Sequence, residues 1–356
     1  MDNLDIICQL LTNGLLLDKA EKQLQAFSDQ EWETLFNLSR KHNVAAILYS
    51  SLKTLSPSIE VPDGIYAQMH EIYLMNAARN TLYLHEAEIL FDALHAEGIP
   101  TIGLKGLYLI ENVYENIALR SMSDLDMLLK KEHIPQVLLL IEDLGYRPTT
   151  YFNIHDENID IKHVPPYIKG QGPYLEIHWT LLEENEPFTI GAEGLWQRAI
   201  PARMGGMDAL ALGLEDLILH LCIHQSYQHH LALGLRGLYD IALVLQQKQK
   251  KVDWDALVRQ AKDWGAERVV ALTFHLLEEL LDVEIPPDVY PHLLQKPIPR
   301  EILDQSKMLI KNKVNTMWSV TPDQARFSSE SGLWVRVKLV LSRIFLPKIT
   351  IARLYA

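Results

Sequence analysis

The sequence predicts an α+β protein in which a small mixed sheet with its own helices is flanked by a helical region on each side. Apolar residues recur at helical spacing before residue 92 and again after residue 193. Between these regions, short apolar and β-branched runs follow the order strand, helix, strand, helix, strand. We therefore expect three units, at 1–92, 93–192 and 193–356.

Start and stop signals support helices in the first unit. Ser28 is followed three residues later by Glu31, which is the capping-box pattern of a helix N-terminus. Leu35 and Leu38 then continue at helical spacing. A later run, "NAARNTLYLHEAEILFDALHAEG", ends at Gly98, which fits a helix C-terminal cap.

In the middle unit, short strand patterns alternate with helical ones. "IPTIGLKG" reads as a strand that leads into a turn at Gly106, and "LYLIENVY" as a short helix. "MSDLDMLLK" predicts a second strand, "EHIPQVLLLIEDLGY" a helix that ends at Gly145, and "GPYLEIHWTLL" a third strand. From about residue 195 onwards the apolar pattern is helical again.

Bulk composition limits the function classes. The formal net charge of -13 argues against general nucleic-acid binding, which requires a basic surface. The two cysteines, Cys8 and Cys222, form no disulfide framework and fit a reducing compartment. The N-terminus has no signal-peptide pattern, and no apolar run approaches the roughly 20 residues that span a bilayer. We expect a cytoplasmic protein without a transmembrane segment.

Two aspartates stand inside the apolar run of the second strand. Asp124 and Asp126 are two residues apart, so on a strand their side chains share one face. Their mutual repulsion and burial make ionisation costly, and a divalent cation would relieve both effects. Acidic residues at this spacing also occur elsewhere, for example at Glu86 and Glu88, so the spacing alone identifies no site.

The context of the two aspartates is more specific than their spacing. They follow the glycine turn "LKG", and a third carboxylate, Glu176, lies in another predicted strand with His178 on the same face. The turn opens a helix whose N–H groups can hold phosphate oxygens. Three carboxylates on neighbouring strands beside such a turn have the layout of a two-metal site for phosphoryl chemistry.

The stretches "LKGLYLIENVYENIALRSMSDLDMLL" and "LEIHWTL" resemble the uncharacterised bacterial nucleotidyltransferase family of the DNA polymerase beta-like nucleotidyltransferase superfamily. The resemblance runs from about Leu35 through "LEDLILHLCIHQ" and "LRGLYDIALVL". It implies a minimal nucleotidyltransferase core, with Gly106 in the turn and Asp124, Asp126 and Glu176 as catalytic metal ligands. The usual turn is Gly-Gly or Gly-Ser, whereas here Lys105 precedes the glycine.

The implied activity is metal-dependent transfer of NMP from an NTP, with ATP as the expected donor and release of pyrophosphate. Two Mg²⁺ ions are expected, and the acceptor is an unidentified small molecule, peptide or protein. Lys105, Gly106, Arg120 and Ser123 are the candidates for nucleotide binding, with Arg120 placed to neutralise phosphate charge. The alternative is a non-catalytic nucleotide- or partner-binding protein that retains the fold. The complete carboxylate set favours catalysis, and the lysine in the turn favours the alternative.

Three histidines are candidates for the acceptor site: His163, His178 and His224. His224 shares a helix face with another histidine four residues earlier, although packing between units explains such a pair equally well. In the next predicted helix, Arg236 and Asp240 are also four residues apart and are expected to pair with each other.

The last 26 residues, 331–356, carry basic side chains among large apolar ones and no acidic residue. Such a pattern can lie on an anionic membrane surface or pack on the acidic body of the same protein.

Overall fold

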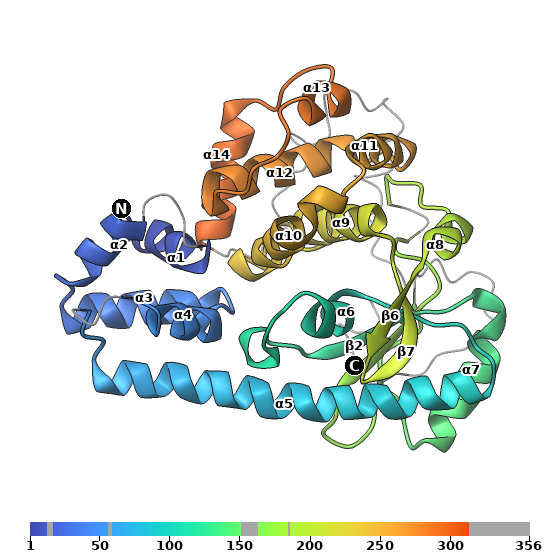
Figure 1. The fold of residues 1–356 in the computed structure, drawn as a ribbon. Helices are drawn as coiled ribbons and strands as arrows, with labels where there is room; N and C mark the ends of the chain where they lie inside the picture. The colour runs from blue at the N-terminus through green and yellow to red at the C-terminus, as the bar shows by residue number, and fades with distance from the viewer. Residues whose placement is uncertain (13–16, 56–58, 151–162, 184–185, 313–356) are drawn as a thin grey trace.

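The computed structural model describes residues 1–12, 17–55, 59–150, 163–183 and 186–312, and the basic segment 331–356 lies outside these residues. Helix α5 (Asp63–Ala96) runs along one side of the molecule, beneath both the N-terminal helices and the sheet (Figure 1). The helices that follow the sheet lie on the opposite side. The predicted α+β class, with helical regions before and after a mixed sheet, is confirmed.

Short helices precede α5 and lie over its first half (Figure 1). The backbone N–H of Ser28 donates to the Glu31 carboxylate at 2.8 Å, so the predicted capping box begins the third helix. Helix α5 ends just before Gly98, whose φ of +66° is the left-handed conformation expected after a helix. The short helices are α1 (Asn3–Thr12), α2 (Leu17–Leu24), α3 (Asp29–Lys41) and α4 (Ala45–Leu52).

The sheet has the strand order β3-β4-β5-β2-β1-β7-β6. Its central strand β2 pairs with β5 in parallel and with β1 in antiparallel orientation. Strand β2 has a neighbouring strand on each edge, and its apolar side chains Leu125 and Met127, which project from a face of the sheet, are fully buried. The strands are β1 (Ile102–Gly103), β2 (Asp124–Leu128), β3 (Arg147–Pro148), β4 (Tyr167–Ile168), β5 (Tyr174–His178), β6 (Ile200–Met204) and β7 (Met207–Ala211).

The sheet includes a hairpin that the sequence analysis placed in the C-terminal helical region. Strands β6 and β7 pair with each other, and β7 extends the sheet by pairing in parallel with β1. Gly205 and Gly206 form the turn with φ values of +60° and +77°, a conformation that suits a two-residue hairpin loop. The apolar run that follows directly, "LALGLEDLILHL", hid this hairpin signal in the sequence.

Two helices connect the strands of the core: α6 (Lys105–Asn112) between β1 and β2, and α7 (Ile134–Asp143) after β2. Both agree with the predicted helices. The segment between α6 and β2 includes a short 3-10 turn and is held by two buried amides of α5. Asn76 donates to the carbonyl of Ala118 at 3.1 Å, and Asn80 donates to the carbonyls at 117 and 120. Helix α5 therefore fixes the chain that leads into β2.

The C-terminal helices cover the sheet on the side away from α5 (Figure 1). Between α9 and α10 the chain forms a π-helical turn at His224–Gln228. Buried apolar residues of all three regions form one continuous core cluster. The C-terminal helices are α8 (Ala192–Arg198), α9 (Leu214–Ile223), α10 (Leu235–Lys248), α11 (Trp254–Asp263), α12 (Glu267–Leu281), α13 (Val289–Leu293) and α14 (Arg300–Asn312).

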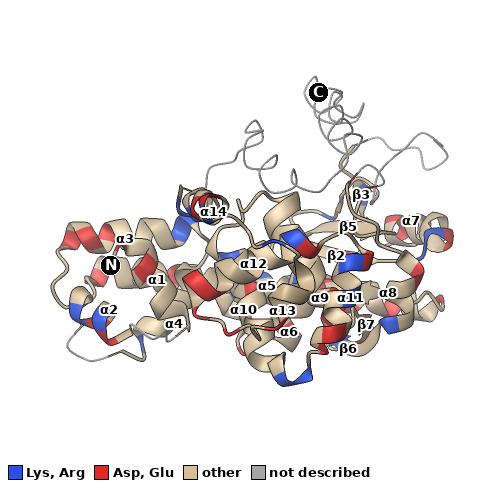
Figure 2. Cartoon of the chain, turned by 90° about the horizontal axis from the view of Figure 1, so that it is seen from above, with Lys and Arg blue, Asp and Glu red and all other residues tan. Residues whose placement is uncertain are grey.

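The charged residues of the described chain are mixed rather than segregated. In the view of Figure 2, Lys and Arg are scattered among Asp and Glu over the helices. Among the described residues, no helix combines the length and apolar character that crossing a membrane requires.

A buried ion pair joins α10 to the sheet region. Arg120 donates from Nε and Nη2 to the two oxygens of Asp240, both at 2.9 Å, and Tyr114 donates its hydroxyl hydrogen bond to the same carboxylate. Both charged side chains are almost fully buried. Asp240 therefore pairs with Arg120 and not with Arg236, the partner that sequence spacing predicted.

We expect Asp240→Asn to destabilise the protein by about 3–5 kcal/mol, because it leaves the Arg120 guanidinium buried without its counter-charge. Urea unfolding of the purified variant measures this difference. Asp304→Asn is the matched control, since Asp304 pairs with Arg300 on the exposed surface of α14 and should change the midpoint little. Equal effects of the two substitutions would contradict a structural role for the buried pair.

Candidate functional site

Asp126 is the centre of a buried polar cluster on strands β2 and β5. The side chain is 1% exposed, and its Oδ1 accepts hydrogen bonds from Lys105 Nζ at 2.7 Å and from His178 Nε2 at 3.0 Å. Burial raises the pKa of Asp126, but the Lys105 charge and the His178 hydrogen bond outweigh this and hold the pKa well below its usual range. Asp126 is therefore ionised.

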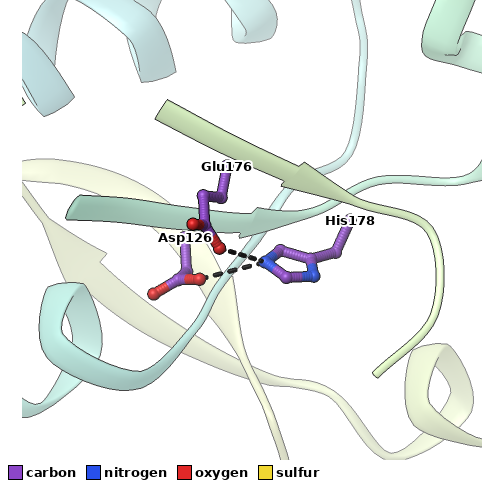
Figure 3. Close-up of side chains that lie close together, drawn as sticks. All are labelled: Asp126, Glu176 and His178. Atoms are coloured by element: carbon purple, nitrogen blue, oxygen red, sulfur yellow. Dashed lines mark hydrogen bonds and ion pairs between the residues drawn. The ribbon is translucent and has the colours of Figure 1, made fainter. Parts of the chain in front are cut away.

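Glu176 and His178 come from β5, which pairs with β2 in parallel. The register places Asp126 opposite Glu176 and Leu128 opposite His178, so these polar side chains share one face of the sheet. His178 Nε2 lies 3.5 Å from Glu176 Oε2, and Figure 3 shows the imidazole directed at both carboxylates. Burial raises the pKa of Glu176, but the opposing effects are larger. The hydrogen bond from His178 is the strongest of them, and the pKa lies below its usual value.

The first aspartate of the pair behaves differently from the second. Asp124 lies on the same face of β2, but its side chain makes no hydrogen bond or ion pair with the described part of the chain. Burial and the nearby Asp126 charge raise its pKa to about 6, although Lys105 partly offsets them. Strand β2 therefore carries one carboxylate with a cation and a hydrogen-bond donor beside it, Asp126, and one without such partners in the described chain, Asp124.

The predicted glycine turn lies beside Asp126. The N–H of Leu104 donates to the Asp126 carbonyl at 3.0 Å, which fixes the start of α6 against β2. Lys105 has a φ of +42°, a left-handed conformation that favours glycine, and its ammonium reaches Asp126 rather than solvent. Gly106 is required because a Cβ there would lie 2.5 Å from Nη1 of Arg120.

The remaining nucleotide-binding candidates occupy different environments. Arg120 was expected to meet phosphates, but the structure places it in the buried pair with Asp240, with Nη1 against Gly106. Asp240 is 120 residues away in the chain, so local sequence gave no indication of this partner. Ser123 is exposed directly before β2, and its carbonyl accepts the N–H of Tyr174 at 3.4 Å.

Of the three predicted acceptor-site histidines, His178 and His163 lie at the carboxylate cluster, and His224 lies in the π-helical turn before α10. His163 is half-buried and its ring centroid lies 4.9 Å from that of His178. His224 begins the π-helical turn and lies 3.0 Å, between Nε2 atoms, from His229. Burial lowers the pKa of His224 well below its ordinary value, and the Lys105 charge contributes, which brings His224 within the electrostatic range of the turn.

The donor atoms of Asp126, Glu176 and His178 fit a metal ion. One ligand atom from each lies within 4.8 Å of the others, and two carboxylates with an imidazole nitrogen form a donor set that divalent cations accept. The family resemblance implied metal-ligand roles for Asp126 and Glu176, whereas His178 was assigned to the acceptor site. The same-face position of His178, two residues after Glu176, was the available signal for a ligand role.

The contrast between the two aspartates predicts opposite effects of neutralising them. The pKa of Asp124 rises from 3.8 to about 6 on folding, so its ionisation destabilises the protein as pH rises through this window. Asp124→Asn should therefore raise the stability near pH 7, by on the order of 1–3 kcal/mol, with no gain below about pH 4. Asp126→Asn should lower the stability, because it leaves the Lys105 ammonium buried without its partner.

Thermal melting from pH 4 to pH 8, with metal chelated, measures both effects. Asp143→Asn, at an exposed position of α7, controls for the loss of one negative charge. A stabilising effect of Asp126→Asn, or a destabilising effect of Asp124→Asn at neutral pH, would show that the two carboxylates do not differ in this way.

The family of this chain follows from comparison of its sequence with models of known protein families. Residues 28–282 match the family model described as "Uncharacterised nucleotidyltransferase", and no curated protein matches. Among solved structures, the chain is similar to a crystal structure of ANT(2")-Ia in complex with adenylyl-2"-tobramycin, at 12% identity and a TM-score of 0.34. That match covers 58% of this chain and 98% of the other. Since the family model spans most of the chain and includes every carboxylate of the cluster, this protein belongs to the uncharacterised nucleotidyltransferase family.

Proposed function

We propose that this protein transfers a nucleotidyl group from an NTP to a nucleophilic acceptor, with release of pyrophosphate, and that a divalent cation is required. The observation that carries the proposal is the cluster of Asp126, Glu176 and His178, on adjacent parallel strands beside the turn at Lys105–Gly106. Family membership supports the same class of reaction.

The proposed ligands of one ion are Asp126, Glu176 and His178. Asp124, on the same face of β2, is proposed as a ligand of the second of the two Mg²⁺ ions expected from the sequence. When bound, such ions supply positive charge that stabilises the phosphate oxygens of the donor. Because the set contains an imidazole, we expect Mn²⁺ to be accepted at least as well as Mg²⁺, which prefers oxygen ligands.

The reaction itself is an in-line displacement at the α-phosphorus. The acceptor releases a proton to solvent and its nucleophile bonds to the α-phosphorus, while the bond between the α-phosphorus and the bridging oxygen of the β-phosphate breaks, so that pyrophosphate leaves with that oxygen. The N-terminus of α6 and Gly106 are proposed to approach the phosphates, and ATP is the expected donor. His163, at the carboxylate cluster, and His224, in the π-helical turn, are proposed to contact the acceptor.

One observation supports the alternative, a nucleotide- or partner-binding protein without catalysis. The Lys105 ammonium already contacts Asp126, and Asp126, Glu176 and Asp124 all raise its pKa although burial opposes this. The Lys105 ammonium can therefore supply the positive charge that a metal ion would otherwise supply to the carboxylates. A metal ion at Asp126 competes with this ammonium for the carboxylate, whereas a non-catalytic protein keeps the lysine as the permanent partner.

Metal-dependent nucleotide binding is the direct test of the proposal. We expect ATP with Mg²⁺ or Mn²⁺ to raise the melting temperature, since a ligand at 100 times its Kd stabilises the folded state by about 2.7 kcal/mol. Neither ATP with chelator nor metal alone should give the full shift. Asp126→Asn should abolish the metal-dependent part.

Asp143→Asn serves again as the charge control and should respond as the wild type does. A shift with ATP that is unchanged by chelation would favour nucleotide binding without a catalytic metal. The absence of a shift with every NTP and metal would reject the proposed activity.

The pH dependence of this shift follows from Asp124. Its carboxylate binds a cation only when ionised, and its pKa is raised to about 6. We therefore expect the metal-dependent shift to decline as pH falls below about 6, and Asp124→Asn to remove that decline together with most of the shift. Isothermal titration of Mn²⁺ into the protein between pH 5 and pH 8 measures the same dependence as an affinity.

A further inference from the structure

Arg236, near the N-terminus of α10, has a charge that no carboxylate in the described part of the chain neutralises. Its Nε is buried and makes no hydrogen bond, and no ion pair joins the side chain to the described residues. Asp240, one helical turn later, accepts its side-chain hydrogen bonds from Arg120 and Tyr114 and none from Arg236.

The position of Arg236 on α10 directs it towards the core. Asp240 and Gln247 lie on the face of α10 that contacts the segment before β2, and Gln247 donates to the carbonyl of Val113 at 2.6 Å. Arg236, four residues before Asp240, continues this face towards the helix N-terminus. At that end the helix follows the π-helical turn that carries His224.

The side chain of Arg236 is half-buried, and its Nε, which is out of contact with water, lacks a hydrogen-bond acceptor, a state that is costly to the folded protein. Burial lowers the pKa of Arg236, and the charge of Arg120 lowers it further, while Asp240 and Asp124 act in the opposite direction. Arg236 lies one helical turn before Asp240, and Arg120, which binds Asp240, has its Nη1 beside Gly106, so this end of α10 lies on the side of the glycine turn.

We propose that Arg236 binds a phosphate group at this site, in the role that sequence analysis gave to Arg120. The inference rests on the proposed function, because the donor nucleotide is the expected source of the phosphate. A guanidinium binds phosphate oxygens through a planar fork of donors, a geometry that an ammonium lacks. A metal-bound phosphate would satisfy both unpaired groups, with the cation at Asp124 and the phosphate oxygens at Arg236.

The test compares Arg236→Met with the wild type in the full chain. Methionine keeps much of the side-chain volume and removes the unsatisfied Nε donor, so the ligand-free variant should melt at a temperature no lower than that of the wild type. Its affinity for Mg²⁺-ATP and for tripolyphosphate, measured by isothermal titration, should fall roughly 10- to 100-fold. Arg236→Lys should restore part of the affinity but not the full value.

Arg259→Met is the matched control, because Arg259 is exposed on α11 and loses the same charge. It should bind both probes as the wild type does. Adenosine, which has no phosphate, should not distinguish Arg236→Met from the wild type.

The probes distinguish a phosphate of the donor from a phosphate of the acceptor. They also distinguish failure of this inference from failure of the proposed function. Loss of Mg²⁺-ATP and tripolyphosphate binding in Arg236→Met assigns the phosphate to the donor. Retained Mg²⁺-ATP binding with loss of inorganic phosphate binding to the nucleotide-loaded protein assigns it to an acceptor. Tripolyphosphate binding that needs Arg236, without any metal-dependent ATP binding, would reject the proposed function and keep the phosphate site. Equal binding of every probe by Arg236→Met and the wild type, or no binding by either, overturns the inference.

Discussion

The Asp126 carboxylate lies almost completely out of water, and the surrounding site is arranged to keep it charged. A lone buried carboxylate would be protonated, so its ionised form depends on the Lys105 ammonium and the His178 imidazole. Each of these two partners is held in position by a different part of the backbone. Lys105 reaches the carboxylate from a left-handed turn, and His178 reaches it because β5 pairs with β2 in one particular register. A shift of that register by one residue would turn His178 and Glu176 to the other face.

The C-terminal helices are part of this arrangement rather than a separate attachment. Arg120 lies between the glycine turn and α10, with one nitrogen against Gly106 and two on Asp240. Because guanidinium and carboxylate are both buried, neither can separate from the other without a large cost. The turn, the start of β2 and α10 must therefore move together, which keeps the charged groups of α10 at a fixed position relative to the carboxylates.

The features that depend on neighbouring residues in the chain could be predicted from the sequence. The three core strands, both core helices and the face shared by Asp124 and Asp126 follow from periodicity, glycine turns and the alternation of a strand. The β6–β7 hairpin was missed because β7 is only five residues long and runs almost directly into the apolar helix α9. The partners of charged residues were harder to predict. Asp240 was matched to its helix neighbour Arg236, whereas its partner Arg120 lies far away in the chain. Such pairs depend on tertiary packing, to which spacing along one helix gives no access.

Helix α5 has a consequence for how the polypeptide can be divided. Its 34 residues span about 50 Å, and the boundary expected at residue 92 falls inside its last turns. A fragment that starts at residue 93 would lack Asn76 and Asn80, whose amides hold the carbonyls of residues 117, 118 and 120. Those carbonyls would have to find water, and the chain entering β2 would lose its anchor. Helix α5 thus supports the N-terminal helices and the sheet at once, and a cut at residue 93 would remove part of the support of both.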